Sequence, residues 1–357
     1  MSDFAKQIED IEKEIRETPY HKGTEHHIGI LRARLSRLKD KILDSETKSK
    51  GSGGGIGYAV KHQGDATIVL VGPPSVGKST LLNALTNAQS RVAPYAFTTV
   101  SVIPGMMVYK NARIQILDVP GLIEGAEVGK GRGKEVLSVV RGCDLLVVIS
   151  EVRKEDAINR IKNALEKNGI RIDKKKPNIK IEKKLQGGIS VFSNIRQPIQ
   201  KDTIKEIIME MGIKNAVVSI KEKITLNELL DGLSRNRVYI PSISVINKAD
   251  LSARSHNNDF LYISAENELN LDKLRESIWK TLDLLTIYLV KGDGEPNFDN
   301  PLVIKNNTKL SEVLERLGSN FSENKTYARI WGPGSKFPGQ EVSLSITATA
   351  GMQIRFI

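Results

Sequence analysis

The stretch from Gly72 to Thr80 holds the residues whose types and spacing most clearly predict chemistry. It matches the phosphate-binding pattern G-x-x-x-x-G-K-[ST] at every fixed position. Glycines let such a loop curl so that successive backbone N–H groups point at one anion. An ordinary glycine turn is the weaker alternative. The predicted nucleotide-binding residues of this loop are Gly72, Pro73, Pro74, Ser75, Val76, Gly77, Lys78, Ser79 and Thr80.

Two of these side chains have specific expected roles. Lys78 is expected to reach the β- and γ-phosphates of a nucleotide, and the Ser79 hydroxyl to ligate Mg²⁺. Residues 67–71 before the loop form an apolar strand candidate, and residues 81–85 after it continue as a helix. This strand-to-helix setting is the one that the motif requires, and it removes most chance matches.

A second motif, D-x-x-G, follows the predicted strand 113–117 as Asp118, Val119, Pro120 and Gly121. The carboxyl ends of parallel strands are where such sheets bind ligands. We therefore expect Asp118 to hold the Mg²⁺ shell and the Gly121 N–H to face the γ-phosphate. Alone the tetrapeptide is weak, but after a phosphate-binding loop at this distance it is a strong indication.

The polar segment 93–99 between these motifs is predicted to be a loop that closes over the bound nucleotide. It ends in Phe97, Thr98 and Thr99, which we count among the nucleotide-binding residues. Thr99 is also expected to ligate Mg²⁺ together with Ser79 and Asp118. We assign the catalytic contribution to Lys78, Thr99 and Gly121.

Two further motifs predict which base is bound. Asn247, Lys248 and Asp250 form N-K-x-D after the predicted strand 242–246. A carboxylate at Asp250 can accept hydrogen bonds from the guanine N1–H and 2-amino groups, which adenine does not offer. Lys248 is expected to lie along the base, and Asn247 to tie this loop to the phosphate loop. The second motif, S-A-x, follows the predicted strand 260–263 and consists of Ser264, Ala265 and Glu266.

With all five motifs in order, the chain resembles the translation-factor-class GTPases, and more narrowly their Obg branch. Residues 95–99 and 118–126, with the glycine-rich run 129–133, carry the narrower resemblance. The whole order is similar to an archaeal member of the developmentally regulated GTP-binding proteins. The resemblance covers nearly the entire chain and implies a Mg²⁺-dependent GTPase that binds GTP and GDP. It also implies a nucleotide-controlled association with the ribosome or its RNA, in translation or ribosome assembly.

Leu122 stands where many GTPases carry a glutamine that orients the attacking water. Because leucine has no polar group to offer, we expect slow intrinsic hydrolysis. Relatives in the Obg branch depart from the glutamine pattern in a similar way. Some related GTPases recruit K⁺, and these typically have asparagine where this loop has Ser75. We expect modest stimulation by K⁺.

The fold class predicted for the chain is α/β, with a P-loop GTPase domain built on a mostly parallel sheet. Apolar residues at helical spacing in 1–50 predict a helical hairpin, and the glycine-rich 51–66 a linker. Gly121 and Asn247 are much further apart than the roughly 30 residues of a βαβ unit, so 169–239 is assigned to an insertion. The resemblance implies a small α/β domain of the type found in ribosomal protein S5.

The GTPase domain therefore comprises 67–168 and 240–284, and a helix is predicted from Glu151 to Lys167. In the C-terminal part, 285–357, strands with one helix and Gly/Pro turns predict a β-grasp module. One of those strands is predicted at 343–347. The module resembles the TGS domain, which the family uses for contact with RNA or protein. The alternative is that this C-terminal module only stabilises the protein and contacts no partner.

The composition points to a polyanionic partner. The 357 residues carry a formal net charge of +11; such a balance favours RNA or an anionic membrane, with solubility alone as the plainer explanation. With no secretory signal and no apolar run long enough to cross a bilayer, we expect a cytoplasmic protein without a membrane partner. The single cysteine, Cys143, fits a reducing compartment and a packing role.

We expect a monomer that binds the ribosome or ribosomal RNA and also has a regulatory protein partner. Two other classes of function remain open. A P-loop kinase uses the same phosphate loop but has no need of N-K-x-D and S-A-x together. An RNA-binding protein with a structural nucleotide would hydrolyse nothing.

Overall fold

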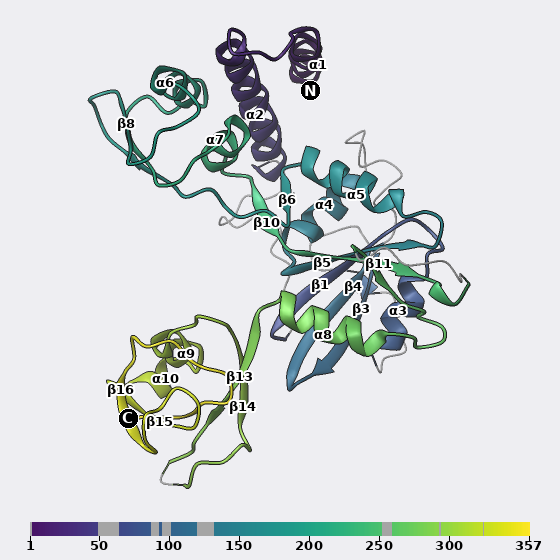
Figure 1. The fold of residues 1–357 in the computed structure, drawn as a ribbon, viewed down its shortest axis with the longest axis vertical. Coiled ribbons are helices and arrows are strands. Elements are labelled where there is room, and N and C mark those ends of the chain that lie inside the picture. The colour runs from purple at the N-terminus through teal and green to yellow at the C-terminus, as the bar shows by residue number, and fades with distance from the viewer. Residues whose placement is uncertain are drawn as a thin grey trace. The chain divides into compact units, whose positions relative to one another are not determined.

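The computed structural model describes residues 2–48, 64–86, 93–94, 101–119, 132–251, 259–292, 294–323 and 325–357 (Figure 1). The chain divides into two compact units. One unit contains Met1–Gly57 and Gly169–Tyr239, and the other contains Tyr58–Asn168 and Ile240–Ile357. Each unit is described by itself below.

The GTPase domain is built on a seven-stranded sheet with the order β12-β11-β5-β1-β4-β3-β2. The five strands from β12 to β4 run parallel; at one edge β3 pairs antiparallel with β4, and β2 pairs antiparallel with β3. The loop predicted for 93–99 is therefore wrong at its first two residues, which form β2. The predicted mostly parallel α/β sheet is confirmed. The strands are β1 (Ala66–Val71), β2 (Ala93–Pro94), β3 (Ser101–Tyr109), β4 (Ala112–Asp118), β5 (Leu145–Glu151), β11 (Ser242–Asn247) and β12 (Leu261–Tyr262).

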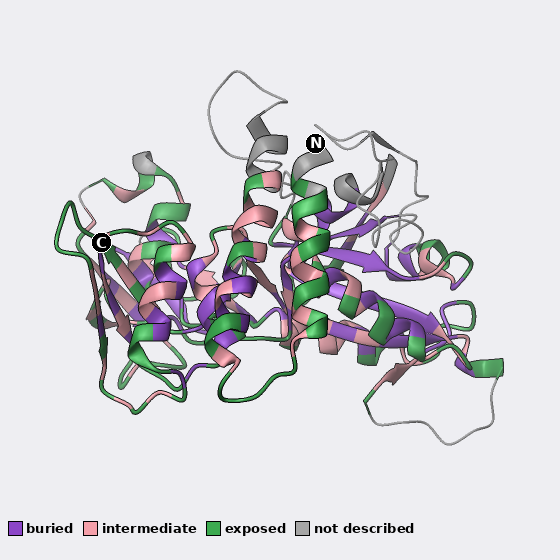
Figure 2. Cartoon of the chain, turned by 90° about the horizontal axis from the view of Figure 1, so that it is seen from above, coloured by how far each residue is buried: buried purple, intermediate pink, exposed green. Residues whose placement is uncertain are grey.

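Helices cover this sheet, as the concentration of buried residues in its strands shows (Figure 2). All six residues of β1 are buried, because a central parallel strand is covered on both faces and consists of apolar residues throughout. In the register, Leu70 lies opposite Asp118, which places that aspartate beside the start of the phosphate loop. The helices are α3 (Lys78–Leu85), α4 (Arg132–Arg141), α5 (Asp156–Lys167), the short 3₁₀ turn η1 (Ala249–Leu251) and α8 (Leu271–Thr281).

The helix predicted to start at Glu151 starts at Asp156 instead. Glu151 is the last residue of β5, and a turn follows in which the Ser150 hydroxyl donates to the Lys154 carbonyl at 2.6 Å. That turn separates the strand from the helix. The prediction of the helix itself is confirmed, and its beginning was wrong.

The other unit joins the N-terminal helical hairpin to the inserted segment. Ala33 of α2 lies in one apolar cluster with Ile204 and Leu229. Arg237 bonds to Asp40 at 3.3 Å and to Asp231 at 3.1 Å, so it bridges α2 and α7. The elements are α1 (Ser2–Glu17), α2 (Glu25–Lys48), β6 (Ile170–Ile172), β7 (Ile179–Lys183), β8 (Ile189–Ser193), α6 (Lys201–Glu210), β9 (Ala216–Ile220), α7 (Leu226–Leu233) and β10 (Val238–Ile240).

Within the insertion, β7, β9 and β8 form a three-stranded sheet. Alternate residues of β9 are buried, as expected of a strand with one covered face. The helix α7 begins with a capping box: the Thr225 hydroxyl accepts from the Glu228 N–H at 3.3 Å, and the Glu228 carboxylate accepts from the Thr225 N–H at 2.7 Å. These two bonds satisfy backbone donors that the first turn leaves unpaired.

The C-terminal domain is a five-stranded mixed sheet with the order β14-β13-β17-β15-β16. Leu310, Val313 and Leu314 of α9 join its apolar cluster, in the arrangement predicted for a β-grasp module. The elements are β13 (Leu284–Leu289), β14 (Pro301–Lys305), α9 (Leu310–Arg316), α10 (Ser319–Ser322), β15 (Tyr327–Trp331), β16 (Gln340–Ser343) and β17 (Gln353–Phe356).

The strand predicted at 343–347 is wrong, because β16 ends at Ser343. The Ser343 hydroxyl accepts from the Ser345 N–H at 3.2 Å, and this local turn takes the chain out of the sheet. In the part of the chain that the structure describes, no helix is long and apolar enough to span a bilayer.

Candidate nucleotide-binding site

The phosphate loop has the curled backbone that its glycines predict. Gly77 has φ = 89° and Ser75 has φ = 61°, so both lie in the left-handed region. A Cβ added to Gly77 would stand 2.4 Å from Asn247 Nδ2, and one added to Gly72 would stand 2.3 Å from the Ile149 carbonyl oxygen. Both positions therefore require glycine, one for its φ and its neighbour and the other for close strand packing.

Lys78 begins α3 and folds back over the loop. Its ammonium group donates to the carbonyl oxygens of Gly72 at 3.1 Å and Pro73 at 2.9 Å. Burial lowers the pKa of Lys78, and the nearby Asp118 carboxylate opposes that shift. A partly desolvated cation over an amide-lined loop is well placed to pair with the oxygens of a polyphosphate.

Ser79 and Asp118 meet at the carboxyl end of the sheet. The Ser79 hydroxyl donates to Asp118 Oδ2 at 2.6 Å. Asp118 is only 3 % exposed, and its Oδ1 is buried without a partner among the described residues. A buried carboxylate oxygen with no donor is costly unless a ligand satisfies it. Mg²⁺ prefers oxygen ligands, so this pair fits the ion that the motif implies.

Asn247 ties two loops together, as predicted. Its Nδ2 donates to the Val76 carbonyl at 2.8 Å, and its Oδ1 accepts from the Ala265 N–H at 2.9 Å. Both bonds are buried. One side chain at the end of β11 therefore fixes the phosphate loop against the S-A-x loop.

Lys248 is held in place by a residue that the sequence reasoning missed. Its Nζ donates to the Ser75 carbonyl at 3.0 Å and to Glu151 Oε2 at 2.6 Å. Hydrogen bonds from Lys154 and Lys248 lower the pKa of Glu151. The signal in the sequence was that Glu151 closely follows the apolar run 145–149, which placed it near the carboxyl end of a strand, where ligand-binding residues gather.

The remaining base-site residues surround this connection. Asp250 lies in η1 and is exposed, with its carboxylate open to solvent. Ser264 is buried and its Oγ accepts from the Asn267 N–H at 3.2 Å, whereas Glu266 is exposed. Because the Ala265 N–H already donates to Asn247, its contact with guanine stays a prediction.

Several predicted site residues lie outside the described residues. These are Phe97, Thr98, Thr99, Pro120 and Gly121, and with them Leu122. Val119 is described and is fully buried. Their contacts with the γ-phosphate and the ion therefore remain predictions.

Comparisons with known proteins agree with this geometry. Residues 67–184 match the family described as 50S ribosome-binding GTPase, and residues 186–284 match the C-terminal region of the MMR_HSR1 domain. An uncharacterised GTP-binding protein of Methanocaldococcus jannaschii is 44 % identical over 95 % of this chain and 88 % of its own length.

Eukaryotic relatives have similar coverage. Developmentally-regulated GTP-binding protein 1 of Xenopus laevis is 39 % identical over 96 % of this chain and 95 % of its own length. Developmentally-regulated GTP-binding protein 2 of Homo sapiens is 38 % identical over 95 % of both.

The fold and the phosphate loop define a P-loop GTPase that binds GTP and GDP. At this identity and coverage, the chain belongs to the developmentally regulated GTP-binding protein family, within the Obg branch.

Proposed function

We propose that this protein is a slow GTPase whose nucleotide state controls its association with the ribosome or ribosomal RNA. The observation that carries the proposal is the linked set of loops around Asn247. It connects Val76 in the phosphate loop with Ala265 beside the predicted base site. A nucleotide held at both ends by connected loops can pass a change at its phosphates to the rest of the domain.

In this proposal the chain's own groups do most of the positioning. Lys78 and the loop amides hold the phosphates, and Ser79 and Asp118 hold Mg²⁺. An ion held there would supply positive charge that offsets the charge of the nucleotide phosphates. To reach those oxygens, the Lys78 ammonium exchanges its two loop carbonyls for phosphate acceptors. Thr99 and Gly121 complete the site in the predicted manner, and Leu122 keeps intrinsic turnover slow.

The proposed base specificity rests on Asp250. Asp250 is exposed in η1, two residues after Lys248, whose ammonium group donates to Glu151. Accepting two hydrogen bonds from guanine would favour GTP over ATP, because adenine leaves the carboxylate unpaired. Modest stimulation by K⁺ belongs to the same proposal.

The proposed ribosomal partner is supported by the family description and by where the positive charge lies. Between residues 169 and 239 the chain has fifteen Lys and Arg and eight Asp and Glu. Lys174, Lys175 and Lys176 are all exposed. A basic surface of this kind binds phosphate backbones and makes affinity depend on salt. We further propose that the protein works in the cytoplasm as a monomer, with a regulatory protein partner.

A ribosome pelleting assay tests the switch. The full chain is mixed with ribosomes in the presence of GDP, a non-hydrolysable GTP analogue, or no nucleotide. Stronger pelleting with the GTP analogue is expected, since only differential affinity shifts a conformational equilibrium. Equal pelleting in all three conditions would refute the switch. If hydrolysis were absent as well, the protein would be an RNA binder in which the nucleotide is structural.

A further inference from the structure

The sheet of the C-terminal domain has one face in the apolar core and one face open. Residues of β13, β15 and β17 that point toward α9 are buried in one cluster: Ile287, Ala328, Ile330, Ile354 and Phe356. The residues that alternate with them on β15 are half-buried. On β15, therefore, the second face of the sheet is accessible to a ligand.

The strand register gives this open face two rows of side chains. One row crosses β13, β17 and β15 and consists of Tyr288, Gln353 and Trp331; Gln353 is only 8 % exposed, so this row is accessible at its β15 end. The next row crosses β17, β15 and β16 and consists of Arg355, Arg329 and Glu341. Neighbouring strands are about 4.8 Å apart, so aromatic and charged groups lie within one side-chain length of each other.

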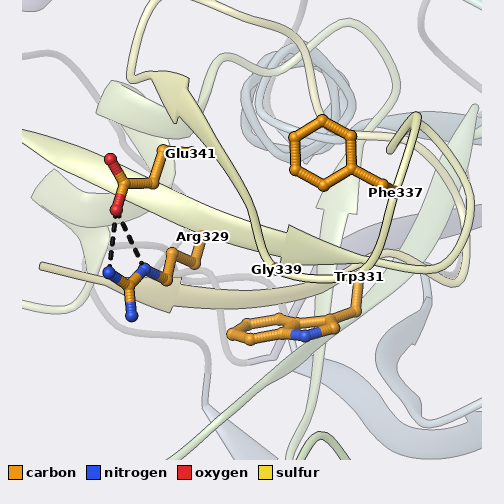
Figure 3. Close-up of a pocket in the computed structure, with 5 residues that line it drawn as sticks. All are labelled: Arg329, Trp331, Phe337, Gly339 and Glu341. Carbon is orange, nitrogen blue, oxygen red and sulfur yellow. Dashed lines mark hydrogen bonds and ion pairs between the residues drawn. The ribbon is translucent and has the colours of Figure 1, made fainter.

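A pocket of about 470 Å³ opens at the β15–β16 end of this face. It is lined by Arg329, Trp331, Phe337, Gly339 and Glu341 (Figure 3). Figure 3 shows the Trp331 and Phe337 rings on opposite sides of the chain at Gly339, which has φ = 75°. The Phe337 side chain is in the loop before β16 and is 60 % exposed. The volume is in the range of small-ligand sites.

The polar wall of the pocket presents both a donor and an acceptor. Arg329 donates from Nε at 3.1 Å and from Nη2 at 2.8 Å, and both bonds end on Glu341 Oε1. Within the described part of the chain, Glu341 Oε2 and Arg329 Nη1 are left for solvent or a ligand. A planar ligand with an amino group beside a ring acceptor matches that pair.

We propose that this pocket binds one unpaired base of single-stranded RNA. The base stacks on one of the two rings, Trp331 or Phe337, while Glu341 accepts from its exocyclic amino group and Arg329 donates to the adjacent ring acceptor. Stacking of splayed bases on aromatic rings, with polar reading of their edges, is how proteins recognise single-stranded RNA. The inference rests on the proposed association with RNA, and it specifies which part of the RNA is bound.

The charges around the pocket favour RNA over a peptide. The Arg355 guanidinium lies 5.3 Å from the centre of the Trp331 ring, and Lys336 precedes Phe337 in the pocket loop. Arg329 is paired with Glu341 and Arg355 also donates to the Gly294 carbonyl, so Lys336 and Arg355 add positive charge beside the pair, which suits a phosphate backbone next to the stacked base. A proline-rich peptide would use the rings alone and leave the ion pair without a role.

Fluorescence anisotropy with labelled eight-nucleotide RNAs tests stacking. The full chain is titrated into oligo(C), oligo(U) and an RNA duplex, and we expect tighter binding of oligo(C) than of the duplex. Of Trp331→Ala and Phe337→Ala, the variant that removes the stacking ring should weaken oligo(C) binding by roughly 5- to 150-fold, the loss expected for one stacked base. Phe321→Ala is the matched control, since Phe321 is 44 % exposed in the same domain but does not line the pocket.

Base identity is tested with Glu341→Gln. The carboxylate of the wild type should favour oligo(C) over oligo(U), because cytosine has an amino donor where uracil has a carbonyl oxygen. A glutamine amide also offers a donor there, so the variant should lose this preference, with oligo(C) affinity falling and oligo(U) affinity level or rising. Thermal melting of each variant separates these effects from unfolding.

Three results would overturn the proposal. The first is that both aromatic variants bind oligo(C) as tightly as the wild type does. The second is that the duplex binds as tightly as oligo(C). The third is quenching of Trp331 fluorescence, measured in a Trp279→Phe background, by decaproline and not by the oligonucleotides, which would identify a peptide groove. Ribosome pelleting is measured separately, so loss of the nucleotide effect there, with oligo(C) binding intact, would refute the switch alone.

Discussion

The GTPase sheet and the C-terminal sheet use opposite parts of a sheet for function. Every residue of the central strand β1 is buried, so the side chains that reach a ligand lie at strand ends of this sheet. Asp118 ends β4 and Asn247 ends β11. In β15 burial alternates, and the polar residues project from the face itself. The uncovered part of a sheet decides where a ligand can bind. A sheet that is covered on both faces offers its strand ends, and a sheet that is covered on one face offers the other face.

The two arrangements also differ in how firmly they hold their functional groups. Asn247 is fixed by two buried hydrogen bonds to backbone groups. The Arg329–Glu341 pair is partly exposed, at 43 % and 55 %. A site at strand ends should therefore fail sharply when one residue changes, whereas a site on an open face should lose affinity in steps.

The largest expected difference is in stability. Leu70→Ala removes a fully buried side chain from the GTPase sheet and should cost about 2–5 kcal/mol, whereas Arg329→Ala should change stability by less than about 0.5 kcal/mol. The two tryptophans separate the domains, because Trp279 packs against the GTPase core and Trp331 is in the C-terminal sheet. Denaturation followed by Trp279 in a Trp331→Phe background measures the first effect. Equal costs for the two changes would contradict the comparison.

Catalysis should depend next most strongly on Lys78. Lys78→Ala removes the cation that pairs with the phosphates and should lower GTP turnover by about 10²- to 10³-fold. Single-turnover phosphate release measures this, with Lys180→Ala, an exposed lysine of the other unit, as the control. A variant that kept its turnover would move the catalytic role elsewhere, first to the segment around Leu122.

A pH profile sharpens the assignment of Lys78. Because burial lowers the pKa of Lys78, this ammonium should lose its proton at a lower pH than an exposed lysine does. As the pH is raised, GDP affinity should therefore begin to fall at a pH lower than the one at which an ordinary exposed lysine loses its proton. Calorimetric titrations across alkaline pH should show that step in the wild type and not in Lys78→Ala.

A smaller effect is expected for the base. Asp250→Asn exchanges an acceptor for a donor at the proposed guanine edge, so GTP affinity should fall by roughly 10- to 100-fold. Xanthosine triphosphate, which carries a carbonyl where guanine has its amino group, should bind better to the variant than to the wild type. Competition against a fluorescent GDP analogue measures both. Equal wild-type affinity for ATP and GTP would rule out the assignment.

The difference between the two sheets also explains what the sequence could predict. The phosphate loop, Asp118 and Asn247 are predictable because a strand end fixes their positions, so their spacing along the chain is constrained. The partnership of Glu151 with Lys248 is not, since the residues are far apart in sequence and Glu151 belongs to no motif.

The face of the C-terminal sheet was harder to predict because it depends on strand register. A strand assigned to 343–347 instead of Gln340–Ser343 leaves Glu341 outside the sheet and hides its pairing with Arg329. The bridge from Arg237 to Asp40 likewise joins residues nearly two hundred positions apart, and only the fold brings them together. An error of a few residues in a predicted strand boundary still allows the domain to be recognised. It changes which side chains share a face, so a site on that face is missed.

The smallest effect is expected for the lysines of the insertion. Lys174, Lys175 and Lys176 are exposed and precede β7, whose sheet has one covered face. If they contact RNA phosphates, replacing all three by alanine should lower the slope of log affinity against log salt by up to about 0.7–0.9 per lost contact. Ribosome pelleting across a salt series measures the slope, and unchanged GTP affinity is the control for folding. An unchanged slope would mean that these lysines are a solvated surface, and the salt dependence would then have to come from other basic residues.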